Sequence, residues 1–229
     1  GEIVTANDDL ARYPINEWRD KYIAENENMP QWYPNLFSGM PSYGGYIYMT
    51  GDPTKLFRNT ILFNLGLKVW FFLSLGGFGT FFLLKTLGSS RNAGVLGGLI
   101  TGLTPYGFGL VNAGHLNKIF AMAYVPWVLA CFLVFMKNKT LKSICVLSLI
   151  TALQLWANHP QIVYYTWMII GFYYVWSIGT EYKGKSFSLA SKLYELGGVL
   201  IALFLAFLMV SDPYNCLLYT SDAADDFDC

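Results

Sequence analysis

Charged residues are scarce in this chain: Asp, Glu, Lys and Arg make up 13% of its 229 residues. Soluble domains carry about 25% charge, so this composition excludes the surface of an ordinary soluble domain. The 15 basic and 15 acidic residues balance to a net charge of zero, which excludes the electropositive surface typical of nucleic-acid binding. Hydrophobic residues make up 54% instead. The composition therefore predicts the lipid bilayer as a partner and no nucleic acid.

Cysteine and histidine are scarce as well, with four and two copies respectively. Cys131 and Cys145 lie inside apolar runs, where a thiol behaves as a small hydrophobe, and no Cys/His spacing resembles a zinc site. Four cysteines in these settings do not suggest a disulfide framework. Asp8 and Asp9 could hold a divalent cation, although two adjacent carboxylates alone are a weak metal signal. We therefore assign no metal ligand and no cofactor, and leave a divalent metal open.

The sequence lacks an initiator Met and a signal-peptide pattern at its start, so we interpret it as a piece of a longer protein. It also lacks an apolar span at its other end. Residues 213–229 there include the run NCLLYTSDAADDFDC, which resembles translated adapter sequence. We expect this tail to be non-native, with a genuine acidic loop as the alternative, and exclude it from the fold.

Residues 1–60 are polar and interrupted by prolines, and we expect them to form a loop region in front of the membrane spans. The run INEWRDKYIAENE within this region has helical spacing. It places Ile15, Trp18 and Tyr22 on one face. One helix is therefore predicted inside the loop region.

The run MPQWYPNLFSGMPSYGG follows this helix. It is too rich in Pro and Gly for regular structure, but too aromatic for a disordered linker. We expect residues 30–48 to pack on the ends of the membrane helices. Burial of Trp32, Phe37 and Tyr43 would contribute roughly 1.5–3 kcal/mol each.

Residues 61–212 are dominated by apolar runs and are predicted to form a transmembrane helical bundle. About 20 helical residues cross the roughly 30 Å hydrocarbon core of a bilayer. The candidate spans are about 62–84, 93–113, 119–136, 142–158, 161–179 and 195–211. The fourth is short and runs into the fifth through Asn158-His159-Pro160, as either a tight hairpin or two half-depth segments. We therefore predict an all-α polytopic membrane protein with six spans, or five in the alternative.

Basic residues are distributed unevenly between the connections. The connections after the first, third and fifth spans hold Lys85, Arg91, Lys137, Lys139, Lys142, Lys183, Lys185 and Lys192, whereas the alternate turns hold Lys118. Basic loops face the cytoplasm under the positive-inside rule. Residues 1–60 and the turns at 114–118 and 158–160 are therefore predicted to be extracytoplasmic.

Glycine recurs at every fourth position of the second span, at Gly94, Gly98 and Gly102. This spacing lets membrane helices approach closely, and we favour packing over ligand contact as its role. Pro105 and Gly107 then loosen the end of the same span. A backbone freed at this depth must be buried in protein or line a wet cavity.

Three polar clusters share the predicted extracytoplasmic face, in the runs NDDLARYP, GHLNK and NHPQ. Their polar members are Asp8, Asp9 and Arg12, then His115, Asn117 and Lys118, and finally Asn158, His159 and Gln161. Each cluster also has a purely structural interpretation. Asp is favoured at helix caps, Lys118 can snorkel to the membrane interface, and His159 can cap the hairpin.

Taken in order, these motifs resemble the YfhO-like bacterial membrane proteins, a family grouped with the GT-C glycosyltransferases. The matching residues are Asp8, Trp32, Phe37-Ser38-Gly39-Met40-Pro41, Gly114-His115, Lys118, Ala123-Tyr124, Pro126-Trp127, His159-Pro160-Gln161-Ile162 and Tyr164-Tyr165. The match covers roughly residues 3–210. Family members are longer, with a helix before the first loop and an outer domain downstream.

The resemblance implies a GT-C-like helical bundle with an extracytoplasmic first loop, in the bacterial cytoplasmic membrane. It implies transfer of a sugar from a polyprenyl-phosphate donor to an extracytoplasmic acceptor, an envelope glycopolymer or glycolipid. An acidic residue early in the first loop serves catalysis in such enzymes, which points to Asp8 or its neighbour Asp9. A carboxylate there would take the proton of the attacking hydroxyl.

Cations must also stabilise the departing lipid phosphate. We assign this role to four residues: His115, Lys118, His159 and Arg12. Four more residues are candidates for lining the substrate pocket: Asn117, Gln161, Trp32 and Tyr124. We expect Asp8, His115, Lys118 and His159 to converge on one outward cavity.

Two rival functions stay open. A flippase or transporter for a lipid-linked sugar would use the same polar groups, but transporters place polar ligands near the bilayer midplane on broken helices. The interiors of these spans hold little beyond Thr101, Ser148 and Gln154. The other rival is a non-catalytic membrane protein of envelope assembly, in which the polar clusters are only loop chemistry.

Overall fold

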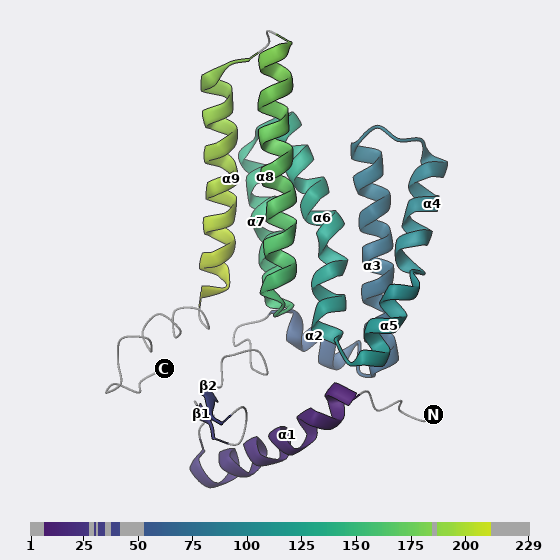
Figure 1. Cartoon of the computed structure of the whole chain (residues 1–229), viewed down its shortest axis with the longest axis vertical. Helices are drawn as coiled ribbons and strands as arrows, with labels where there is room; N and C mark the ends of the chain where they lie inside the picture. The colour runs from purple at the N-terminus through teal and green to yellow at the C-terminus, as the bar shows by residue number, and fades with distance from the viewer. Residues whose placement is uncertain are drawn as a thin grey trace, which may run out of the picture.

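The computed structural model describes residues 7–27, 30, 32–34, 38–41, 53–184 and 187–211. Helices dominate this part of the chain and stand side by side as a bundle, with α1 lying across one end (Figure 1). The elements are α1 (Asn7–Asn26), β1 (Trp32–Tyr33), β2 (Met40–Pro41), α2 (Thr54–Thr60), α3 (Leu65–Thr86), α4 (Arg91–Gly102), α5 (Pro105–Ala113), α6 (Leu116–Asn138), α7 (Leu141–Trp156), α8 (Pro160–Lys183) and α9 (Leu189–Met209).

Five helices of the described residues are long and apolar enough to cross a bilayer. They are Leu65–Thr86, Arg91–Ala113, Leu116–Asn138, Pro160–Lys183 and Leu189–Met209, of which the second is α4 and α5 taken together. α7 is apolar but has 16 residues, or about 24 Å of helix. This is shorter than the roughly 30 Å hydrocarbon core. The protein is an all-α polytopic membrane protein, and the described residues contain five full-length spans and one short apolar helix.

The loosening predicted at Pro105 is a break between two helices. α4 ends at Gly102, and α5 starts afresh with Pro105 in its first turn after Thr104. Proline has no N–H to donate to a carbonyl of the preceding turn, but it suits the first position of a helix. The second apolar run is therefore not one continuous helix.

The predicted start of the sixth span is wrong. α9 begins at Leu189 and not at residue 195, because the Ser188 hydroxyl accepts from the backbone N–H of Ser191 and caps the helix. Hydroxyl acceptors at this position stabilise a helix start. Lys192 therefore lies inside the helix, although the sequence placed it in a connection.

The turns between the helices fall into two sets at opposite ends of the bundle (Figure 1). We call the end with the α5–α6 turn at Gly114–His115 and the α7–α8 turn at 157–159 the histidine end. The lysine end carries the α3–α4, α6–α7 and α8–α9 connections. α2 lies at the histidine end and α1 beyond it (Figure 1). This alternation is the arrangement that the lysine distribution predicted.

α3 and α4 meet through glycines. A Cβ atom on Gly77 would lie 2.7 Å from the carbonyl oxygen of Gly98, and one on Gly98 would lie 2.8 Å from the carbonyl oxygen of Gly77. A Cβ atom on Gly94 would lie 2.9 Å from Cδ2 of the Phe81 ring in α3. The packing role predicted for the repeated glycines is confirmed, and α3 is their partner.

α6 is the central helix of the bundle. It packs against α3 on one side and against α7 and α8 on the other, while α9 packs on α7. The indole Nε1 of Trp127 donates to the carbonyl of Leu75 at 2.8 Å, and the missing side chain of Gly79 leaves room for this ring. Phe135 fills the equivalent space at Gly198 of α9. Aromatic rings set against glycines thus fix the spacing of the helices.

The helix predicted before the spans is confirmed, although α1 begins earlier, at Asn7. Trp18 and Tyr22 share one face of it, with ring centroids 5.5 Å apart. Tyr33 of β1 packs on Trp18 at 5.2 Å. The Pro- and Gly-rich run was predicted to lack regular structure, but β1 and β2 form a short antiparallel pair. The two-residue strands hold Tyr33 against α1.

The predicted packing of residues 30–48 is described only in part. Tyr33 is buried against α1, and the Trp32 side chain is 53% exposed. Phe37, Tyr43 and the predicted non-native tail at 213–229 lie outside the described residues. The structure therefore shows an ordered α1–β1 contact, and packing of Phe37 and Tyr43 on the membrane helices stays a prediction.

Candidate functional site

His115 lies in the tight turn between α5 and α6. Gly114 ends α5 with φ +82°, a left-handed conformation that glycine adopts without steric cost. The backbone N–H of His115 then donates to the Leu110 carbonyl at 2.9 Å. This turn places an exposed imidazole at the histidine end, immediately before the first turn of α6.

Lys118 lies in the first turn of α6 and is half-buried. Its Nζ is 5.5 Å from the centroid of the Tyr106 ring, which belongs to α5. A cation at this distance is attracted by the ring face. The contact holds the lysine along α5, within one helical turn of His115.

His159 lies in the turn between α7 and α8. Asn158 has φ +53°, a region that asparagine tolerates better than most residues, and it reverses the chain so that α8 begins at Pro160. Burial is the largest effect on the pKa of His159 and lowers it; a hydrogen bond with its own backbone raises the pKa by less, and the charges of Lys118 and His115 lower it further. The neutral ring is therefore favoured near pH 7, and its buried Nδ1 has no other hydrogen-bond partner among the described residues.

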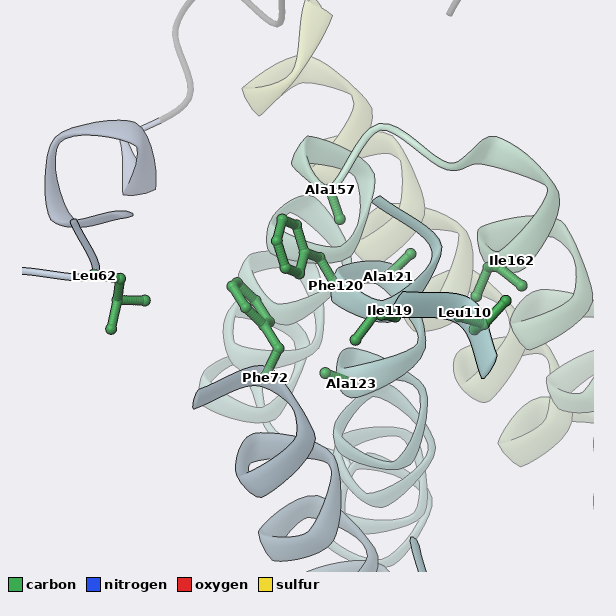
Figure 2. Packing of buried hydrophobic residues seen from close by; sticks show 9 residues of the cluster. All are labelled: Leu62, Phe72, Leu110, Ile119, Phe120, Ala121, Ala123, Ala157 and Ile162. Carbon is green, nitrogen blue, oxygen red and sulfur yellow. The ribbon is translucent and has the colours of Figure 1, made fainter. Parts of the chain in front are cut away.

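The two histidine turns are neighbours because one apolar cluster holds them together. Leu110 of α5, Ala121 of α6, and Ala157 and Ile162 on either side of the α7–α8 turn are all buried in this cluster (Figure 2). Phe72 of α3 joins it through Phe120, with ring centroids 4.2 Å apart. His115, Lys118 and His159 thus come together at one end of the bundle, although they are distant in sequence.

Arg58 is a cation that the sequence reasoning missed. It lies in α2, with its guanidinium carbon 5.9 Å from the centroid of the Phe120 ring. Phe120 follows Lys118 by two residues in α6, so Arg58 belongs to the same end of the bundle. A signal was available: Arg58 is an arginine immediately in front of the first apolar run. We call Arg58, His115, Lys118 and His159 the basic cluster.

Asp8, Asp9 and Arg12 lie in α1, with the two aspartates in its first turn. Carboxylates are favoured there because they face the positive end of the helix dipole. The side chains of these three residues are outside the described part of the structure. α1 as a whole lies beyond the histidine end (Figure 1), the same end as the basic cluster.

The four predicted pocket residues are spread more widely. Asn117 is half-buried beside Lys118. Gln161 is exposed and donates to the Tyr165 hydroxyl at 2.7 Å along the surface of α8. Tyr124 packs edge-on against Phe72 between α3 and α6, and Trp32 lies on β1. Of the four, Asn117 directly precedes Lys118 of the basic cluster, and both lie in the first turn of α6.

A large apolar groove runs along α3, α4 and α5. Its volume is about 1570 Å³, and aromatic and aliphatic side chains such as Trp70, Phe78 and Leu99 line it. Its lining begins at the histidine end with Asn112 and Leu116 and reaches Arg91 at the lysine end. Leu116 follows His115 directly in the sequence, so one end of the groove lies near the start of α6, although none of the four residues of the basic cluster is part of its lining.

A second charged cluster, which the sequence analysis did not foresee, lies at the lysine end. Lys192 Nζ lies 2.8 Å from Glu195 Oε2 and 2.6 Å from Glu181 Oε1. Lys139 Nζ lies 2.7 Å from Glu195 Oε1. The side chains of Lys192 and Glu195 are each only 4% exposed. We call these four residues the ion cluster; it joins the ends of α6 and α8 to the start of α9.

Among the described residues, no three His, Cys, Asp or Glu side chains are grouped so that they could hold a metal ion. Cys131 and Cys145 are both free thiols. Comparison of the chain with protein-family models, with curated proteins and with solved structures finds no match. The arguments about function therefore rest on the residues of this chain.

Proposed function

We propose that this protein is a membrane glycosyltransferase that moves a sugar from a polyprenyl-phosphate donor to an extracytoplasmic acceptor in the bacterial envelope. The observation that supports this proposal most directly is the position of the groove. A long apolar groove suits an isoprenoid chain, and its end near the start of α6, the helix that carries Lys118, suits the phosphate to which such a chain is attached. The motif resemblance to YfhO-like proteins points to the same substrate class.

The basic cluster supplies what the leaving phosphate needs. When the bond between the sugar and the phosphate breaks, the bonding electrons stay on the phosphate oxygen and negative charge builds there. Lys118 and Arg58 belong to this end of the bundle, and fixed cations in a partly dry site stabilise such charge strongly. His159, kept neutral by burial, would donate a hydrogen bond.

The acceptor hydroxyl must lose its proton as it attacks the sugar. A carboxylate within hydrogen-bonding reach accelerates such a step by about 10²–10⁴-fold. Asp8, or Asp9 as its alternative, is the candidate base, because α1 lies at the same end of the bundle as the basic cluster (Figure 1). The lysine-rich opposite end would face the cytoplasm under the positive-inside rule.

Substitution of the acids and cations tests the proposal. Purified protein in nanodiscs would be given a polyprenyl-phosphate sugar together with envelope glycolipids as acceptors, and release of polyprenyl phosphate would be measured. We expect Asp8→Asn or Asp9→Asn to lower the rate by roughly 10²–10⁴-fold, and Lys118→Ala to lower it by about 10²–10³-fold. Asp20→Asn is the matched control, because Asp20 is an exposed aspartate of α1 paired with Arg19.

Three results would contradict the proposal. If the native protein released no polyprenyl phosphate, it would not be the proposed enzyme. Full activity of both aspartate variants would remove the assigned base. Movement of the lipid-linked sugar across a liposome membrane, unchanged in Asp8→Asn, would instead identify a flippase.

A further inference from the structure

α7 ends short of a full membrane crossing at the histidine end. The helix has 16 residues and turns into α8 within three residues, 157–159. Figure 1 shows the start of α8 set back toward the middle of the bundle, compared with the α5–α6 turn. The α7–α8 turn and the α5–α6 turn therefore do not end at the same level of the bundle (Figure 1).

Gln154 is the central polar residue below this turn. Its side chain is fully buried between three helices. The amide Nε2 donates to the Ala121 carbonyl of α6 at 3.2 Å and to the Thr166 hydroxyl of α8 at 3.0 Å. These two acceptors fix the orientation of the amide, so the Oε1 atom must point elsewhere. That oxygen has no hydrogen-bond partner among the described residues.

Thr151 precedes Gln154 by three residues, which places both on one side of α7. It too is fully buried. Other hydroxyls inside the apolar helices donate to a carbonyl of their own helix: Thr101 of α4 donates to Gly97 at 2.9 Å, and Ser148 of α7 itself donates to Ile144 at 2.9 Å. The Thr151 hydroxyl makes no such bond and has no partner among the described residues.

Two buried oxygens on one helix face, both without a partner in the described part of the chain, are costly unless something binds them. Trp167 of α8 adds a buried indole N–H that also has no partner among the described residues. Buried water typically makes two to four hydrogen bonds to such groups, whereas apolar cavities stay dry. The buried atoms without a partner among the described residues of α7 and α8 thus include both acceptors and a donor.

We propose that Gln154 Oε1 and Thr151 Oγ1 bind ordered water in a polar recess between α6, α7 and α8. This water would lie below the α7–α8 turn, where both side chains are fully buried. This inference stands on its own and does not depend on the proposed glycosyltransferase function.

Thr151→Val tests the recess by stability, because valine has nearly the same shape and lacks the hydroxyl. If water binds the hydroxyl, the substitution removes its hydrogen bonds, and the Tm in detergent should fall by roughly 2–4 °C. Thr101→Val is the matched control, since its hydroxyl bonds within its own helix. An unchanged or raised Tm for Thr151→Val would overturn the proposal. A buried hydroxyl that binds no water destabilises the folded state, so its removal would not lower the Tm.

Thiol accessibility gives a second, independent readout. Thr151→Cys would be introduced with the native cysteines replaced by serine, and labelled with a small water-soluble methanethiosulfonate. Ala152→Cys is the control, because Ala152 is equally buried at the same depth but belongs to an apolar cluster. We expect Thr151→Cys to react several-fold faster. Equal rates, with both thiols reactive after denaturation, would show that no water reaches Thr151.

Discussion

At the scale of single residues, Lys192 and Glu195 place buried charges in a membrane helix, which is unusual. Both are charged and almost fully buried, and each has a further partner, Glu181 or Lys139, that is 37% exposed. Charges inside a membrane helix are expensive unless they pair. The ion cluster meets this requirement and at the same time joins α9 to α6 and α8.

Removing one charge of the buried pair should destabilise the protein. Glu195→Gln leaves Lys192 with one carboxylate and should lower the free energy of unfolding by roughly 1–3 kcal/mol. The double variant Lys192→Met with Glu195→Leu should recover most of this loss, because an apolar pair can replace a buried ion pair. Thermal unfolding in detergent measures both variants. A double variant less stable than the single one would mean that the pair itself is favourable.

The stability of the protein should depend on pH through His159. Burial lowers the pKa of this ring, so the folded state binds the proton less readily than the unfolded chain. The contribution of His159 is therefore fully present above the ordinary histidine pKa of about 6.5 and is lost as the pH falls below that value. We expect the Tm of the native protein to fall more between pH 8 and pH 5 than that of His159→Gln. Parallel pH profiles would contradict the assignment.

Some of these residue-level features were readable in the sequence and others were not. His115, Lys118 and His159 could be placed together because apolar runs on both sides fix their depth. Pairing of Lys192 with Glu181 could not be predicted, because it depends on how far apart α8 and α9 stand. The partners of Gln154 were hidden for the same reason.

At the scale of elements, the glycine contact between α3 and α4 makes a sharp prediction. Gly98→Ala would place a Cβ 2.8 Å from the backbone of Gly77, and a backbone atom cannot move aside as a side chain can. Overpacking of this kind costs typically about 1–3 kcal/mol. Thermal unfolding in detergent should show the loss.

Gly109→Ala is the matched control for this substitution. A Cβ at Gly109 would meet no atom within 4 Å, and alanine favours the helix. The Tm of this variant should be equal to or above that of the native protein. Equal losses for the two variants would point to a general effect of glycine removal and not to the contact with Gly77.

The extent of the membrane helices was largely predictable, because about 20 apolar residues must be helical in lipid. α7 was recognised as short from the spacing between Lys142 and Pro160. The positions at which helices start were harder to predict. Several serines near Ser188 could cap α9, and the packing of the helix decides which of them does.

At the scale of the whole molecule, the two ends of the bundle should lie on opposite sides of the membrane. We expect Asn117→Cys to be labelled from outside intact cells by an impermeant maleimide, and Ser89→Cys to be labelled only after permeabilisation. Asn117 lies at the histidine end and Ser89 in the α3–α4 connection at the lysine end. The native cysteines would first be replaced by serine. The reverse labelling pattern would invert the proposed topology.

The architecture as a whole followed from composition and the alternation of basic turns, whereas the relation of Asp8 to the basic cluster did not. Asp8 lies in α1, which is joined to the bundle by a run rich in Pro and Gly. No periodicity in such a run fixes the angle of the helix before it. The position of the acid is therefore the part of the site that sequence patterns constrain least.

The break at Pro105 divides the second span into two mechanical parts. α4 is clamped to α3 through Gly98, whereas α5 begins without a hydrogen bond from Pro105 and carries the His115 turn. α5 is held instead by α6, through Leu110 in the apolar cluster, so we expect any relative motion of the two parts to centre on Thr104 and to run on the microsecond-to-millisecond scale. Because α4 and α5 both line the groove, such a motion would change its width at the histidine end. A lipid would then enter by lateral diffusion within the leaflet, and its chain would never leave the hydrocarbon phase.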